Sequence, residues 1–152
     1  MFVGEKKDSY NKYKLVNIKI MPFPIELKYI KEAEIELEIE FPKSFIQKME
    51  KENGGEFTTE EDDWIFFPFF DKFDNKRISR TCNHIVLETR QLREIEGFPQ
   101  KGIAIAENGC GDNLIMLPLE NDQTKLNDII YIWLHESGEI IEIANSIEEL
   151  IE

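Results

Sequence analysis

Four short apolar segments in the last third of the chain constrain its fold more than any other feature. They are GIAIAE (102–107), DNLIMLPL (112–119), DIIYIWLH (128–135) and EIIEIA (139–144), separated by the polar turns NGCG, ENDQTK and ESG. Consecutive apolar segments of this length, joined by turn residues, predict strands connected as hairpins. We therefore expect a largely antiparallel sheet from this part of the chain.

Earlier residues show helical periodicity instead. In PFPIELKYIKEAEIELEIEFP (22–42), one helical stripe carries Leu27, Ile30, Ala33 and Leu37. Pro24 suits a helix start, because its fixed φ is compatible with a first helical turn. The last part, EIELEIEF, also alternates as a strand would, so periodicity alone leaves both structures open. We expect a helix through about Leu37 and then an extended connector into Pro42.

A second helix is expected directly after Pro42, in the segment KSFIQKMEK. Asn53, Gly54 and Gly55 follow it, and they end a helix readily because these residue types accept positive φ at low cost. The next residues, EFTTEEDDWIFFPFF (56–70), predict an acidic turn followed by a strand.

A third helix is expected over NHIVLETRQLREIEG (83–97), with Gly97 at its C-terminal cap. NSIEELIE (145–152) predicts a short closing helix with Asn145 or Ser146 as its N-cap. Helices followed by hairpin-spaced strands indicate an α+β fold, in which helices flank a largely antiparallel sheet. No repeat or linker divides the chain, so we expect one domain.

Composition excludes several classes of protein. At 152 residues the chain can bury a sizeable core, and its two cysteines, Cys82 and Cys110, are too few for a disulfide framework. The N-terminal residues show no signal peptide, and the longest apolar block, WIFFPFF (64–70), is far shorter than a membrane span and contains Pro68. We therefore expect a cytoplasmic protein that does not enter a membrane.

The net charge of −13 is distributed unevenly along the chain. Residues 1–20 carry five lysines and two acids, whereas residues 103–152 carry eleven acids and one base, Lys125. An acidic field of this kind attracts cationic partners and repels nucleic acid, although acids that merely solvate the surface would give the same composition. Direct nucleic-acid binding is further disfavoured because no basic stripe with interleaved aromatics occurs.

The turn NGCG raises the possibility of a reactive thiol. Cys110 as nucleophile, His135 as base and Asp112 as the group that orients the base would form a catalytic set. The acidic surroundings disfavour it, because nearby negative charge raises the pKa of a thiol. Asn-Gly is a strong hairpin signal, so we interpret Gly109 and Gly111 as turn residues. His135 is then expected to cap a hairpin while bonded to a carboxylate such as that of the neighbouring Glu136.

A metal or cofactor site is not expected. Cys82 and His84 could supply two ligands, whereas zinc sites need three or four and no further cluster lies nearby in the sequence. Trp133 and Tyr131 occupy alternate positions in a predicted strand, and Trp133 is assigned to the core.

Four consecutive acids, Glu60 to Asp63, precede Trp64. They repel one another unless they are solvated or meet a cationic partner, so a solvated loop and a binding loop are both open. An aromatic residue beside charges is typical of an interface hot spot, although Trp64 could equally point inward.

Three segments together resemble the SUKH superfamily, which includes fungal cell-wall-assembly regulators and bacterial immunity proteins. They are IKEAEIELEIEFPKSFIQKMEKENGG, GIAIAENGCGDNLIML and IIYIWLHESGEIIEIANSIEELI, in the family's order and covering roughly residues 25–152. The family often has glycine where Glu38 stands. Residues 1–22 have no counterpart and form an N-terminal extension, in which KYKLVNIKIM (12–21) predicts an early strand or an ordered arm.

The resemblance implies an immunity protein that binds a cognate toxin domain, and the acidity favours a basic, nuclease-like target. A regulatory or scaffold module without a toxin partner is the alternative, and no catalytic residue is assigned. The candidate contacts are Glu60, Glu61, Asp62, Asp63, Trp64, Glu107, Asp112 and Glu136. The structural turn and core positions are Pro42, Asn53, Gly54, Gly55, Gly109, Gly111 and Trp133. The oligomeric state is left open.

Overall fold

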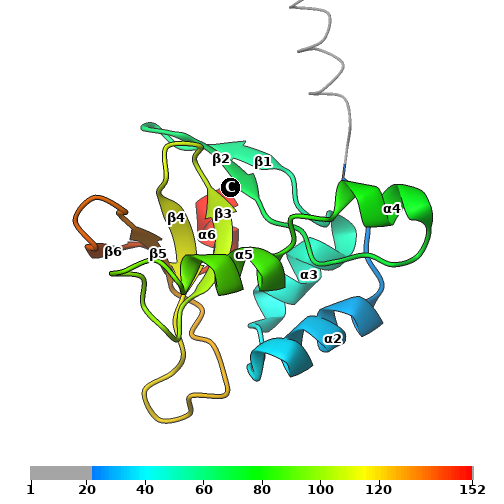
Figure 1. Ribbon diagram of the computed structural model, residues 1–152, viewed down its shortest axis with the longest axis horizontal. Coiled ribbons are helices and arrows are strands. Elements are labelled where there is room, and N and C mark those ends of the chain that lie inside the picture. Colours follow the sequence, from blue (N-terminus) through cyan, green and yellow to red (C-terminus); the bar gives the residue numbers. More distant parts are fainter. Residues whose placement is uncertain (1–21, 152) are drawn as a thin grey trace, which may run out of the picture.

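The computed structural model describes residues 22–151, and its strands form one antiparallel sheet in which sequence neighbours pair (Figure 1). The strands are β1 (Glu56–Thr58), β2 (Asp63–Phe66), β3 (Ile103–Glu107), β4 (Asn113–Met116), β5 (Ile130–Trp133) and β6 (Ile140–Ala144). The helices are α2 (Leu27–Leu37), α3 (Lys43–Lys51), α4 (Asn75–Arg80), α5 (Ile85–Leu92) and α6 (Ile147–Ile151). The predicted α+β class is confirmed.

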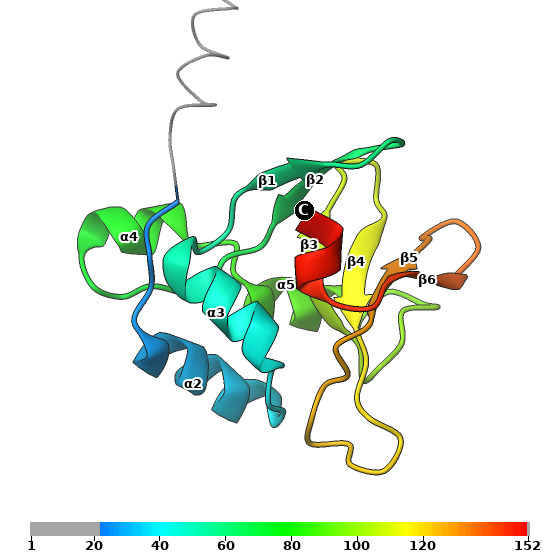
Figure 2. The ribbon, with the colours of Figure 1, turned by 180° about the vertical axis from the view of Figure 1, so that it is seen from behind.

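Strands β3 and β4 are buried because helices cover the sheet from both sides. Figures 1 and 2 show α5 across one face of the sheet and α6 across the other. Residues 103–106 of β3 and 114–116 of β4 have no exposed surface. A strand covered on both faces has an apolar run instead of an alternating pattern, which explains the sequences IAIA and LIM.

An aromatic cluster packs α3 and its flanking segments together. The ring of Phe41 stacks on Phe45 at a centroid distance of 5.4 Å, and Phe69 meets Phe41 edge-on at 5.0 Å. Phe45 and Phe69 are 0% and 1% exposed. Buried aromatic pairs of this geometry are among the strongest apolar contacts in small domains, so this cluster fixes α3 against the rest of the core.

The third predicted helix is shorter than expected. Helix α5 begins after His84, whose Nδ1 accepts a hydrogen bond from the Leu87 amide at 3.3 Å, and it ends at Leu92 instead of Gly97. The chain turns away because Phe98 packs edge-on against Trp133 at 5.1 Å, while the Gly97 carbonyl accepts from the Trp133 indole at 3.1 Å. Tertiary packing therefore overrides the helical pattern of residues 93–97. Helix α4 was not predicted.

The region 56–70 forms a hairpin, β1–β2, instead of a turn and one strand. Strand β2 ends at Phe66, shortly before Pro68, which has no amide hydrogen for a sheet. Beyond it, the buried Asn53 side chain accepts from the Phe69 amide at 2.8 Å and donates to the Phe69 carbonyl at 2.9 Å. Asn53, just after the end of α3, thus anchors the residues that follow β2.

Helix α2 ends at Leu37, as predicted, through a left-handed residue. Glu38 has φ 58°, and it is the one non-glycine residue with positive φ in the part of the chain that the structure describes. The amides of Glu38 and Ile39 bond back to the carbonyls of Ile35 and Glu34 at 3.3 and 3.1 Å. These bonds close a Schellman motif that glycine would adopt without a steric penalty.

The remaining structural positions lie at helix ends and in the core. Pro42 is the N-cap residue of α3, and Ser146 precedes α6 with its hydroxyl accepting from the Glu149 amide at 3.4 Å. Trp133 is 1% exposed. The strand or arm predicted at 12–21 lies outside the described residues. In the described range, no helix is long and apolar enough to cross a membrane.

Candidate functional site

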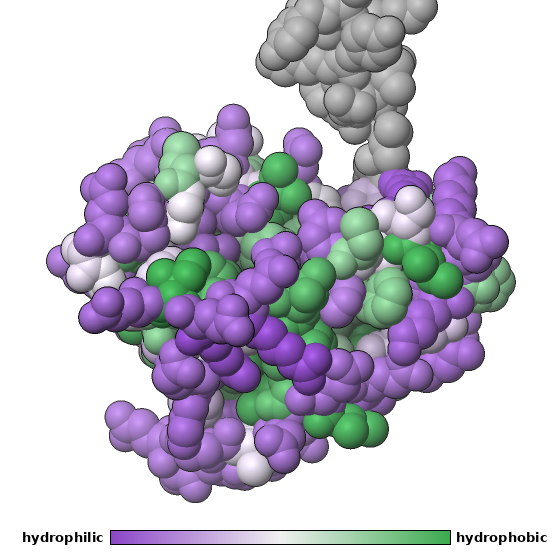
Figure 3. All heavy atoms as spheres, in the orientation of Figure 1, coloured by the Kyte–Doolittle hydropathy of each residue, from purple (hydrophilic) through white to green (hydrophobic). Residues whose placement is uncertain are grey.

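Three hairpin turns meet at one end of the sheet. Because β1 to β6 form a continuous antiparallel meander, alternate turns fall at the same end, and Figure 1 shows them along its upper left side. We call these segments, residues 59–63, 107–112 and 134–139, the hairpin rim. Hydrophilic residues predominate over this part of the face in Figure 3.

Side-chain hydrogen bonds link the turns of the hairpin rim. The side-chain nitrogen Nδ2 of Asn108 donates to Asp62 Oδ2 at 3.2 Å and to Asp112 Oδ2 at 3.3 Å. The Asn108 oxygen accepts from the amides of Cys110 and Asp112 at 2.9 and 3.2 Å, which fixes the turn itself. Asn108 therefore joins the β1–β2 and β3–β4 turns, although the sequence gives no signal for this role.

Asp112 links the β3–β4 turn to the β5–β6 turn. One of its carboxylate oxygens lies 2.7 Å from His135 Nδ1 and accepts from the His135 amide at 3.1 Å. Partial burial would raise the pKa of Asp112, but its hydrogen bonds with His135 and Asn108 outweigh this effect and hold that pKa below its ordinary value. His135 is thus bonded to a carboxylate, as expected, and the carboxylate is Asp112 and not Glu136.

Gly109 and Gly111 give the β3–β4 turn its shape. Both have positive φ, at 80° and 101°, so the interpretation of NGCG as a turn is confirmed. At Gly111 a Cβ atom would lie 2.9 Å from the His135 ring, whereas at Gly109 it would meet nothing within 4 Å. Gly111 therefore also provides the space in which His135 approaches Asp112.

The charged side chains of the hairpin rim are acidic, and His135 is its one histidine. Its three segments contain eight carboxylates and no lysine or arginine. Glu60, Glu61, Asp63 and Glu136 are exposed, whereas Asp62, Glu107 and Asp112 are half-buried. The structure therefore brings the predicted acidic residues together from three separate turns into one surface.

The Trp64 side chain points into the core and not toward the surface. Its side chain is 2% exposed, and its indole nitrogen donates to Thr59 Oγ1 at 3.3 Å. An interior indole cannot offer contact area to a partner. Trp64 instead supports the β1–β2 turn from the core side.

The structure assembles only one pair of the catalytic set Cys110, His135 and Asp112. Asp112 and His135 are paired, but among the described residues no hydrogen bond joins the exposed Cys110 thiol to His135. Cys82 bonds to Asn83 at 3.4 Å, while His84 caps α5 and stacks on Phe70. Over residues 22–151 there is no group of three or more His, Cys, Asp or Glu that could hold a metal ion.

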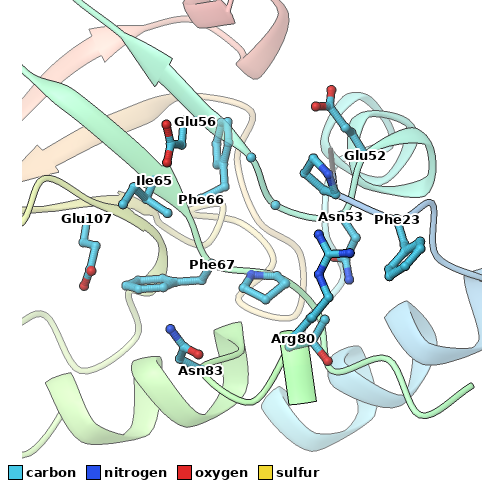
Figure 4. Close-up of a pocket in the computed structure, with 15 residues that line it drawn as sticks. Phe23, Glu52, Asn53, Glu56, Ile65, Phe66, Phe67, Arg80, Asn83 and Glu107 are labelled. Carbon is cyan, nitrogen blue, oxygen red and sulfur yellow. The ribbon is translucent and has the colours of Figure 1, made fainter. Parts of the chain in front are cut away.

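A cavity of about 440 Å³ borders the hairpin rim at Glu107 (Figure 4). Its walls come from the residues before α2, the turn after α3, strands β1 and β2, and the residues between α4 and α5. No local pattern in the sequence could have indicated it, because the fold assembles it from distant segments.

Comparison with known families identifies the family of this chain. The model of the SMI1 / KNR4 family (SUKH-1) matches residues 24–152, which confirms the resemblance and its extent. A search of curated proteins gives no match. Because the family model covers nearly the whole chain, the protein belongs to the SMI1/KNR4 family (SUKH-1).

Proposed function

We propose that this protein is an immunity protein that binds a cognate toxin domain through the hairpin rim and neutralises it without a chemical step. The observation that carries the proposal is the convergence of three turns, all acidic and free of lysine and arginine, at one end of the sheet. Membership in a family of toxin immunity proteins gives the class of activity. The acidic surface gives the chemistry of the target.

The target that fits this surface is a basic, nuclease-like domain. A nuclease binds a phosphate backbone with lysine and arginine, so an acidic inhibitor can cover the same groove. Attraction between such surfaces accelerates encounter and makes association sensitive to salt. The protein itself is not expected to bind nucleic acid directly.

Preorganisation supports the same conclusion. The bonds from Asn108 to Asp62 and from Asp112 to His135 hold the three turns before any partner arrives. A surface fixed in this way loses little conformational entropy on binding, so more of the contact energy remains as affinity.

The first experiment is co-purification of the tagged protein with the toxin domain encoded by the adjacent gene, at low and at high salt. A complex that weakens with salt, together with restored growth of toxin-expressing cells, is the expected result. No complex and continued growth arrest would contradict this pairing and favour a non-catalytic regulatory module.

Charge reversal then locates the surface. Glu60→Lys with Glu61→Lys changes two exposed acids whose side chains make no hydrogen bond with another residue in the described range. We expect association to slow at least tenfold with a smaller change in dissociation, because exposed charges act mainly during encounter. The matched control is Glu26→Lys with Glu120→Lys, two exposed acids away from the hairpin rim. Equal effects of both pairs in surface-plasmon kinetics would contradict the assignment.

A further inference from the structure

The cavity beside the hairpin rim has one acidic, partly apolar wall. Glu56 on β1 pairs with Ile65 on β2, and Ile65 pairs with Glu107 on β3. Side chains at paired positions lie on the same face of a sheet, so these three form a row across three strands. Adjacent strands are about 4.8 Å apart, which places the two glutamates roughly 10 Å from each other with the isoleucine between them.

Ile65 is available for contact. It is 49% exposed, although it lies in a strand between two paired strands. Figure 4 shows its side chain between Glu56 and Glu107 at one side of the cavity. An exposed aliphatic surface flanked by carboxylates fits a side chain that has an apolar stem and a cationic end.

The field on this side of the cavity is negative. Glu88 on α5 has a raised pKa, first because of burial and second because of the charge of Glu107. Among the described residues that line the cavity, Arg80 is the single basic one, and Figure 4 shows it on the far side. There its guanidinium lies 4.5 Å from the centre of the Phe23 ring. It is therefore not placed between Glu56 and Glu107.

The turn that closes another wall is held firmly. Lys48 donates to the carbonyls of Glu52 and Gly54, and its ammonium lies 4.1 Å from the centre of the Phe66 ring. Asn53 is buried and bonded to the backbone of Phe69. The cavity is thus a preformed feature of the fold, and preformed sites lose less entropy when they are filled.

We propose that this cavity receives an arginine side chain of the protein partner. The aliphatic stem packs on Ile65, and the guanidinium bonds to Glu56 or Glu107. Arginine fits better than lysine because its planar group offers five donors, which can reach a carboxylate in pairs, and it is more weakly hydrated. This inference rests on the proposed function, because it takes the partner to be a protein. Glu107 belongs both to the cavity wall and to the hairpin rim, so the two surfaces are continuous.

The test uses the full chain, labelled with ¹⁵N, and the peptide acetyl-Gly-Arg-Gly-amide. We expect saturable shifts of the amides of Gly55, Ile65 and Glu107, with a dissociation constant on the order of millimolar, as a single side chain supports. The citrulline peptide, neutral and nearly isosteric, should give no saturable shift. Glu56→Gln with Glu107→Gln should weaken arginine binding at least tenfold, whereas Glu26→Gln with Glu120→Gln, exposed acids outside the cavity and the hairpin rim, should leave it unchanged.

Three outcomes would overturn the inference. They are the absence of saturation with the arginine peptide, equal shifts with the citrulline peptide, and movement of the same amides when Lys12, Lys14 and Lys19 are changed to glutamine without peptide. The last result would mean that the chain's own basic N-terminal residues fill the cavity.

The two proposals fail separately. A failed titration beside an intact, salt-sensitive toxin complex would overturn the cavity assignment alone. Saturable, arginine-selective shifts would support the cavity assignment even where the toxin experiment contradicts the proposed function.

Discussion

The imidazole Nδ1 of His135 lies 2.7 Å from a carboxylate oxygen of Asp112, and this contact joins two hairpin turns whose residues are 23 positions apart. The same oxygen accepts from the His135 backbone amide at 3.1 Å. The position of the β5–β6 turn is therefore tied to that of the β3–β4 turn. The shape of the hairpin rim depends on a few short contacts that substitutions can test.

Gly111→Ala should destabilise the protein more than Gly109→Ala. Both changes force a Cβ atom onto a residue with positive φ, at a cost of about 1 kcal/mol. At Gly111 the new atom also meets the His135 ring at 2.9 Å, so we expect a further loss of about 1–2 kcal/mol. Urea unfolding of the two variants measures the difference. Equal losses would show that the His135 ring moves aside freely.

Asp112→Asn should reduce stability at neutral pH and remove part of its acid dependence. The folded pKa of Asp112 is lowered from 3.8, so its contribution is present above that value and is lost as pH falls through the lower folded value. We expect a loss on the order of 1 kcal/mol at pH 7, since the carboxylate is partly exposed, and a smaller difference at pH 3. Urea unfolding at both pH values measures it, with Glu60→Gln as control. A difference independent of pH would contradict the role of the charge.

Glu38→Gly should stabilise the protein. Glu38 has φ 58° at the end of α2, where glycine has no steric penalty. The greater freedom of glycine in the unfolded chain offsets part of the gain, so we expect about 0.5–1 kcal/mol. Glu36→Gly, an exposed change inside the same helix, should instead cost about 1 kcal/mol. Thermal unfolding followed by circular dichroism distinguishes them, and two losses would contradict the prediction.

Lys48 should make stability rise at alkaline pH. Burial lowers the pKa of Lys48 from 10.5 to about 8, so between these values the unfolded chain binds more protons than the folded one. Stability then increases as pH rises through this window. From pH 7 to pH 10, the unfolding free energy of the native chain should therefore increase relative to that of Lys48→Met. Lys51→Met, an exposed change on the same helix, is the control, and a flat difference for Lys48→Met would refute the shift.

The part of the sheet formed by β3 to β6 could be predicted because its signals are local. The apolar runs of β3 to β6 and turn residues such as Gly109 and Gly111 act on their immediate neighbours, and the hairpins follow from them. The end of α5 could not be predicted in the same way. Residues 93–97 keep a helical pattern, and the chain leaves the helix because Phe98 packs on Trp133, a contact across the fold.

The sequence by itself determined the fold class, the consecutive hairpins of β3 to β6, the turn at NGCG, the family and the acidity of the candidate surface. Only the tertiary structure decided that Asp62, Asn108, Asp112 and His135 form one linked rim, that Trp64 lies inside, and that Glu56 and Glu107 flank Ile65 beside a cavity. The physical reason is that periodicity and turn chemistry depend on neighbours along the chain. A surface or a cavity depends on strand register and helix packing, which bring distant residues together.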